Sequence, residues 1–297
     1  MGEVRPEARE VGEVGEVRRP GSTTSSQVMV VEDGAARMRP DELATEEPME
    51  VRVAAGGERR TLAVTMRTPG ADFELAAGFL FSEGVVAGRD GIRSIRYCVD
   101  RDVEADQRYN VVTVDLAVRT LPGLEAMERH FLTTSACGVC GKANLDALQL
   151  RAGRVPAGPT VGAGTLRRLP DELRRAQGVF ASTGGLHAAA LFAPGGELMA
   201  LREDVGRHNA VDKVLGWAVL EGRIPLNEQL LVVSGRSSYE ILQKAVTAGV
   251  PIVCAVSAPS SLAVDVARAF GVTLVGFLRA GRFNVYTGEE RIALASG

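Results

Sequence analysis

The chain lacks the long apolar segments that membrane proteins and exported precursors need. No stretch of its 297 residues approaches the roughly 18 uninterrupted apolar residues of a membrane-spanning helix. The N-terminal segment mixes Glu and Arg with Gly and Pro, so it lacks the apolar centre of a signal peptide. We therefore expect a cytoplasmic protein with no membrane partner.

Cysteine is scarce and the net charge is small. Four cysteines are too few for a disulfide scaffold in a chain of this length, so a paired cysteine motif is more typical of a reactive or metal-binding site. The formal net charge is −3, so no overall positive field attracts nucleic acid. Apolar residues make up 45% of the chain, which is ordinary for a globular protein of about two domains.

Two differently patterned regions follow a polar N-terminal segment. Residues 1–27 are rich in Glu, Arg, Gly and Pro and then in Ser and Thr, so we expect a disordered tail. Alternating apolar residues around a Gly-Gly turn predict a β-hairpin over 49–66, and helical spacing predicts an amphipathic helix over 72–83. A further alternating strand is predicted over 109–118. These elements predict a smaller N-terminal α+β domain over 28–132.

The pattern changes from about residue 180, where short apolar runs alternate with helices. Such a succession is typical of right-handed crossovers in an α/β sheet. The runs span 230–233, 251–256 and 272–278, and the helices between them begin near 237 and 260. We therefore predict a second, α/β domain over 133–297, so that the chain is α/β with an α+β organisation overall.

The most reactive segment contains Cys137 and Cys140 in a Cys-Gly-Val-Cys-Gly sequence. The flanking Gly138 and Gly141 predict an exposed, mobile loop at the start of the second domain. Lys142 favours the thiolate form of a neighbouring cysteine, which is the reactive form.

Three functions fit this pair. A structural zinc site needs four ligands, but Cys98 and Cys254 are isolated and are better interpreted as buried small side chains. Thioredoxin-like dithiol exchange suits the spacing but lacks the Trp-Cys-Gly-Pro type of flank. A persulfide carrier needs a mobile nucleophilic thiol, with a second thiol to resolve or relay. Local chemistry does not separate dithiol exchange from persulfide transfer.

Residues 204–213 lead from a strand into a helix. Asn209 and Asp212 resemble a capping box at the start of that helix. The other polar residues of the segment have no capping role, and we predict a functional one for them: Asp204, Arg207, His208 and Lys213.

A similar pattern follows the next strand, over residues 234–240. Ser237 and Glu240 make a second predicted capping box, while Gly235 permits close approach and Arg236 suits a phosphate. Ligands of open α/β sheets bind beyond the carboxyl ends of the strands. Together with Ser234, these residues predict a crevice for an anionic, phosphate-bearing ligand.

Two further segments are ambiguous. Residues 182–187 end in His187, which either forms a third wall of the crevice or is a core residue. Residues 279–288 carry two arginines and two aromatic residues that suit phosphate contact and base stacking, or else they form an edge strand that ends at Gly288.

Taken together, these segments closely resemble the formate dehydrogenase accessory sulfurtransferase family (FdhD). The similarity extends from about residue 49 to 287. The motifs that carry it are Thr68-Pro69-Gly70, Cys137-Gly138-Val139-Cys140-Gly141, Ser182-Thr183-Gly184-Gly185-Leu186-His187, residues 202–213 and Ser234-Gly235-Arg236-Ser237-Ser238.

This resemblance implies a sulfurtransferase that takes sulfur from a cysteine desulfurase as a persulfide on Cys137. It further implies transfer to the molybdenum cofactor, as bis(molybdopterin guanine dinucleotide), before insertion into formate dehydrogenase. Cys140 matches the second, assisting thiol. The segment matched to cofactor contact comprises Phe283, Asn284, Val285, Tyr286, Thr287 and Gly288.

The resemblance also implies a second domain similar to cytidine deaminase, and a homodimer. His208, Ser234, Arg236 and Ser237 occupy the places of the deaminase zinc ligands, but the thiols are missing, so we expect no zinc. The cofactor would be a bound substrate, and a guanine nucleotide is a second candidate ligand. A non-catalytic cofactor-binding chaperone and a thiol-disulfide oxidoreductase remain alternatives.

Overall fold

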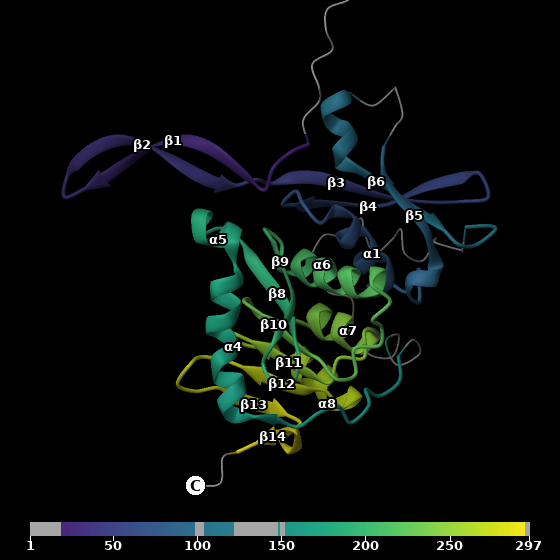
Figure 1. The fold of residues 1–297 in the computed structure, drawn as a ribbon, viewed down its shortest axis with the longest axis vertical. Helices are drawn as coiled ribbons and strands as arrows, with labels where there is room; N and C mark the ends of the chain where they lie inside the picture. The colour runs from purple at the N-terminus through teal and green to yellow at the C-terminus, as the bar shows by residue number, and fades with distance from the viewer. Residues whose placement is uncertain (1–18, 99–103, 122–147, 149–151, 295–297) are drawn as a thin grey trace, which may run out of the picture.

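The structure is a computed structural model that describes residues 19–98, 104–121, 148 and 152–294 (Figure 1). Among the described helices, none is long and apolar enough to cross a membrane. The predicted Cys137–Cys140 loop and the predicted domain boundary at 132/133 lie outside these residues.

A long hairpin opens the described chain. Strands β1 (Thr23–Glu32) and β2 (Ala35–Ala44) pair antiparallel along their whole length and project away from the body of the molecule (Figure 1). The predicted disordered tail is therefore too long, because residues 23–27 belong to β1. Their Ser- and Thr-rich composition did not predict a strand, because the backbone hydrogen bonds of β1 are made with β2.

The N-terminal α+β region contains a four-stranded sheet in the order β4-β3-β6-β5. The predicted hairpin is confirmed as β3 (Glu47–Ala55) and β4 (Glu58–Arg67), and the predicted strand is confirmed as β6 (Val111–Leu116). Strand β5 (Ile92–Tyr97) completes the sheet, and α1 (Asp72–Ser82) confirms the predicted helix. Two short 3-10 helices, Arg89–Gly91 and Ala105–Asn110, connect these elements.

The second region is built on a six-stranded sheet in the order β13-β12-β11-β10-β8-β9. The three predicted apolar runs are its parallel centre: β10 (Leu230–Val233), β11 (Ile252–Ala255) and β12 (Thr273–Gly276). Strands β8 (His187–Phe192) and β13 (Asn284–Thr287) flank this centre and run antiparallel to it. Strand β9 (Leu198–Asp204) forms one edge. The α/β prediction is confirmed.

Helices cover both faces of this sheet (Figure 1). On one face lie α6 (Arg207–Leu220), α7 (Tyr239–Thr247) and α8 (Ser261–Phe270); on the other lies α4 (Ala163–Ala176), followed by α5 (Gly178–Thr183). Side chains alternate between the faces, so that Leu231 of β10 packs with the first set and Val232 with α4. Short strands β7 (Val161–Gly162) and β14 (Ile292–Ala293) pair outside the main sheet, and a 3-10 helix (Glu289–Arg291) precedes β14.

The two regions share one apolar core. Helix α1 crosses α6 at Gly78 and Gly216, where a Cβ on either glycine would lie 1.8 Å from a backbone carbonyl oxygen of the other helix. One continuous cluster of buried residues joins Val51 and Leu75 of the first region to Val214 and Leu231 of the second. This packing fixes α6, whose first turn carries predicted site residues, against the N-terminal sheet.

Candidate functional site

The carboxyl ends of β10 and β11 lead into two loops that lie side by side. The backbone N–H of Ser237 donates to the carbonyl of Ala258 at 3.2 Å, and the N–H of Ser260 donates to the carbonyl of Ser237 at 2.9 Å. Because β8 runs antiparallel to β10 and pairs with β9, the start of β8 at His187 and the end of β9 at Asp204 reach the same edge. This edge, named the carboxyl edge below, is where the sequence predicted the site.

The first predicted capping box is wrong. Helix α6 begins at Arg207 with Gly206 as its N-cap, and no side chain caps it. Asn209 instead donates to the carbonyl of Met66 at 2.7 Å, across to β4. Asp212 is buried and accepts hydrogen bonds from Lys244 at 2.8 and 2.9 Å. Both side chains therefore bond α6 to neighbouring elements and do not cap its N-terminus.

The second predicted capping box is also wrong. Helix α7 begins at Tyr239, after Ser238 as its N-cap, and again no side chain caps it. Ser237 is fully buried, and its hydroxyl has no partner within the described chain. Glu240 pairs with Nε2 of His208 at 2.9 Å, and this hydrogen bond lowers the pKa of the glutamate.

Asp204 and Lys213, two of the predicted site residues, form a buried ion pair. Their side chains are 0% and 2% exposed and form an ion pair at 2.7 Å. Asp204 also accepts the backbone N–H of Thr68 at 3.1 Å, and Lys213 donates to the carbonyl of Thr68 at 2.8 Å. The pair thus fastens Thr68, just after β4, to β9 and α6. Both groups are enclosed and satisfied, so neither presents its charge to a ligand.

Other predicted residues do meet at the carboxyl edge. His187, Arg207 and Gly235 come together, because a Cβ added to Gly235 would lie 3.4 Å from Nδ1 of His187 and 3.7 Å from Cδ of Arg207. His208 follows Arg207 and reaches the loop that carries Gly235, where its Nε2 lies 3.2 Å from the hydroxyl of Ser238. We name His187, Arg207 and His208, together with Gly235, the basic cluster.

The electrostatics of the basic cluster favour a neutral His187. Burial lowers the pKa of its imidazole, and the positive charges of Arg207 and His208 lower it further, whereas Asp204 acts in the opposite direction. Ser234 stabilises the start of β8, because its hydroxyl accepts a hydrogen bond from the backbone N–H of Ala188 at 2.9 Å. Arg236 is exposed at the same edge.

The residues of the predicted cofactor segment 283–288 lie at different ends of the sheet. It forms β13, the edge strand that was the alternative prediction, and Gly288 ends it with φ of 71°. Asn284 lies opposite Gly276 at the carboxyl edge, whereas Thr287 lies opposite Leu274, toward the other end of the sheet. Phe283 and Val285 pack on the α4 side of the core, and Thr287 bonds the carbonyl of Val272 at 2.8 Å.

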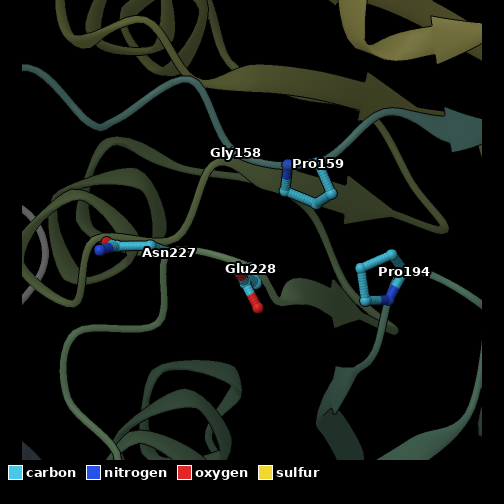
Figure 2. A pocket seen from close by; sticks show the side chains of 5 residues that line it. All are labelled: Gly158, Pro159, Pro194, Asn227 and Glu228. Atoms are coloured by element: carbon cyan, nitrogen blue, oxygen red, sulfur yellow. The ribbon is translucent and has the colours of Figure 1, made fainter.

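Two open hollows lie at the opposite, amino edge of the sheet. One, of about 470 Å³, is bordered by Gly158, Pro159, Pro194, Asn227 and Glu228 (Figure 2). The other, of about 370 Å³, is bordered by Tyr286, Thr287 and Gly288 together with Arg154 and Arg268. The last three residues of the predicted cofactor segment therefore border a hollow at the edge of the sheet opposite the basic cluster.

The cysteines divide into two classes. Cys98 and Cys254 are buried as predicted, and burial raises the pKa of the Cys254 thiol to about 12, which makes it unreactive. Cys137 and Cys140 lie outside the described residues. Within the part of the chain that the structure describes, no group of three His, Cys, Asp or Glu side chains is placed to hold a metal ion.

Comparison with known proteins agrees with the motifs. The sequence model of the FdhD/NarQ family matches residues 44–293. The chain belongs to the FdhD/NarQ family. Proteins named sulfur carrier protein FdhD are 53% identical in Streptomyces avermitilis, over 92% of this chain and 96% of the relative, and 54% identical in Mycobacterium tuberculosis, over 86% and 92%.

The fold is similar to that of a solved structure. A crystal structure from Desulfotalea psychrophila, assigned as a formate dehydrogenase accessory protein, has a TM-score of 0.70 and 25% identity over 91% of this chain and 99% of its own. The structure brings part of the site predicted from the sequence of this FdhD/NarQ protein together at the carboxyl edge. The sequence did not show that Asp204 and Lys213 are buried, and it did not show that His187 lies beside Arg207 and Gly235. The two glycines before His187, where a strand starts at the carboxyl edge, were the available signal.

Proposed function

We propose that this chain is a sulfur carrier that serves the maturation of formate dehydrogenase in the cytoplasm. The observation that carries the proposal is similarity over nearly the whole chain to proteins named sulfur carrier protein FdhD. The Cys-Gly-Val-Cys motif in the matched region supplies a suitable nucleophile. Cys254 is no competitor, because its thiol is buried and its pKa is raised.

The loading step is an exchange between a persulfide and a thiolate. The Cys137 thiolate attacks the outer sulfur of a persulfide on a cysteine desulfurase. The S–S bond of the donor breaks, an S–S bond to Cys137 forms, and the donor cysteine leaves as a thiolate. Lys142, two residues after Cys140, favours the attacking thiolate electrostatically.

The unloading step needs two electrons if sulfur leaves as sulfide, and Cys140 can supply them. Its thiolate attacks the inner sulfur of the Cys137 persulfide, which releases hydrosulfide and leaves a Cys137–Cys140 disulfide. A cellular thiol reductant then restores the dithiol. This scheme gives both cysteines of the motif a role and keeps every electron accounted for.

The acceptor in this proposal is the molybdenum cofactor in its bis(molybdopterin guanine dinucleotide) form, held as a substrate. Its phosphates suit the positive charge of the basic cluster and the exposed Arg236. Tyr286 and Gly288 border the second hollow with Arg154, which supports a contact between this hollow and a different part of so large a molecule. A homodimer remains part of the proposal, and light scattering of the purified protein tests it.

Mass spectrometry after incubation with a cysteine desulfurase and cysteine tests the carrier chemistry. We expect a reductant-sensitive gain of one sulfur atom on the wild type and on Cys254→Ala, and no gain on Cys137→Ala. Absence of the gain from wild type, with an active desulfurase, would favour a cofactor chaperone without sulfur chemistry.

Formate dehydrogenase maturation separates the remaining alternatives. A sulfur carrier requires that Cys137→Ala abolish maturation while nucleotide binding persists. A non-catalytic chaperone predicts full maturation by the Cys137→Ala/Cys140→Ala protein. A thiol-disulfide oxidoreductase predicts turnover of disulfide substrates by the wild type without any desulfurase.

A further inference from the structure

The hairpin of β1 and β2 projects from the body of the molecule, and both of its strands are fastened at the root (Figure 1). Before β1, Arg19 lies over the ring of Tyr97, with its Cζ 5.0 Å from the ring centroid. After β2, the backbone N–H of Thr45 donates to the carbonyl of Ser22 at 3.0 Å. The arm therefore leaves the body from a fixed base, although a two-stranded sheet is only marginally stable by itself in water.

The turn of the hairpin determines which backbone groups of β1 are left without a strand partner. Asp33 and Gly34 have φ of 52° and 81°, which is typical of the two-residue type I′ turn. The residues that flank such a turn bond each other, and bonded pairs then alternate with non-bonded pairs along the strands. The even-numbered residues of β1 therefore bond β2, as the Ser22 bond also shows, and the odd-numbered ones, Met29 among them, direct their N–H and C=O groups outward.

The two outer edges of the hairpin differ in how they are protected. The strand β2 carries Arg37, Arg39 and Asp41, and Pro40, which opposes an odd-numbered residue of β1, has no N–H to donate outward. By contrast, residues 23–31 of β1 contain no charge and no proline. Within the described chain, β1 pairs with no strand except β2. Charges and prolines are what keep natural edge strands from pairing, so β1 is the edge that is open to another strand.

The open edge is complementary to a copy of itself. Met29 and Val31 are 65% and 61% exposed, and Met38, directly opposite Met29, is 64% exposed on the same face. An antiparallel copy of β1 places uncharged residues against uncharged residues, so no like charges are opposed. Pairing of two β1 strands leaves only the protected β2 edges free, and the assembly therefore ends at two copies.

We propose that β1 pairs antiparallel with β1 of a second copy of this chain, which gives a four-stranded sheet in the order β2-β1-β1-β2 across a two-fold axis. The proposal rests on the homodimer included in the function proposed above, and it assigns the interface of that homodimer to the N-terminal hairpin. The outward N–H and C=O groups of β1 then gain partners, and a hairpin that is marginal alone becomes half of a wider sheet.

Sedimentation velocity of the purified protein over a range of concentrations tests this interface. We expect wild type to dimerise. Met29→Pro removes one outward N–H from each copy, so it should raise the dissociation constant of the dimer at least about tenfold. Met38→Pro is the matched control, because it makes the same change at the opposite, similarly exposed residue of the β2 edge, and it should dimerise like wild type. Met29→Thr keeps the N–H and should also dimerise.

Hydrogen exchange at low and high protein concentration locates the contact. Dimerisation should slow the exchange of β1 amides and leave that of β2 amides unchanged, and Met29→Pro should remove this dependence on concentration. Equal dissociation constants for Met29→Pro and Met38→Pro would overturn the proposed pairing. Equal loss of the dimer in Met29→Pro and Met29→Thr would also overturn it, because the contact would then depend on the apolar side chain and not on the strand edge.

The outcomes also separate this interface from the function proposed above. A dimer that persists unchanged in Met29→Pro would keep the homodimer and overturn its assignment to β1. A wild type that is monomeric at every concentration would overturn both. The persulfide assay on Cys137 reads the carrier chemistry independently, since none of these variants changes the Cys-Gly-Val-Cys motif.

Discussion

At the scale of single residues, the Asp204–Lys213 ion pair holds Thr68 to the second region. Lys213→Met leaves the Asp204 carboxylate buried without its cation, which should lower the free energy of unfolding by about 3–5 kcal/mol. Asp204→Asn/Lys213→Met removes both charges together and should lose less. Urea denaturation of the three proteins measures the differences, and a double variant no more stable than Lys213→Met would contradict the ion-pair account.

His187 gives a pH-dependent prediction at the same scale. Its pKa lies below the ordinary 6.5, mainly because burial disfavours the charged ring. The unfolded chain then binds more protons than the folded one as the pH falls, so His187 lowers stability below about pH 6.5 and has no such effect well above it. We expect the stability of His187→Asn to fall less than that of wild type between about pH 7 and about pH 5. Denaturation curves across this range test it, and parallel losses in the two proteins would refute it.

At the scale of elements, the crossing of α1 and α6 depends on two glycines. A Cβ at Gly78 would lie 1.8 Å from the carbonyl oxygen of Asp212, and one at Gly216 would lie 1.8 Å from that of Glu74. Gly78→Ala must therefore push the helices apart, and we expect it to cost at least about 2 kcal/mol of unfolding free energy. Gly164→Ala is the matched control, because that glycine is also helical but has open space around it, and it should be neutral or slightly stabilising. Similar midpoints for the two variants in thermal denaturation would argue against close helix packing.

The elements themselves could largely be predicted from apolar spacing, but their ends and contacts could not. The strands and helices over 230–276 follow from buried runs of regular length, which are a local signal. Both capping boxes failed because Asp212 and Glu240 are used by Lys244 and His208, which are distant in sequence. Strand β1 was missed because its pairing with β2, rather than its own composition, makes it a strand.

At the scale of the whole molecule, the sequence predicted which residues meet at the carboxyl edge but not which of them the fold buries. Ligands of open α/β sheets bind beyond the carboxyl ends of the parallel strands. His187, Arg207 and Gly235 lie close together at that edge in the structure. The rule says nothing about which charges the fold encloses, so Asp204 and Lys213 were grouped with residues that stay accessible. Nor could spacing show that β13 runs from the carboxyl edge toward the other end, which separates Asn284 from Tyr286 and Gly288.

The continuous core predicts that the two regions unfold together. Trp217, the only tryptophan, lies on α6 of the second region, and Leu75 is buried on α1 of the first in the same apolar cluster. Leu75→Ala should cost about 2–5 kcal/mol, and we expect the urea midpoint from Trp217 fluorescence to fall as far as the midpoint from far-UV circular dichroism. Separate domains would instead leave the Trp217 transition in place while part of the dichroism signal moved to lower urea. Coincident shifts would mean that a defect in helix α1 of the first region reaches the basic cluster through α6, whose first turn carries Arg207 and His208.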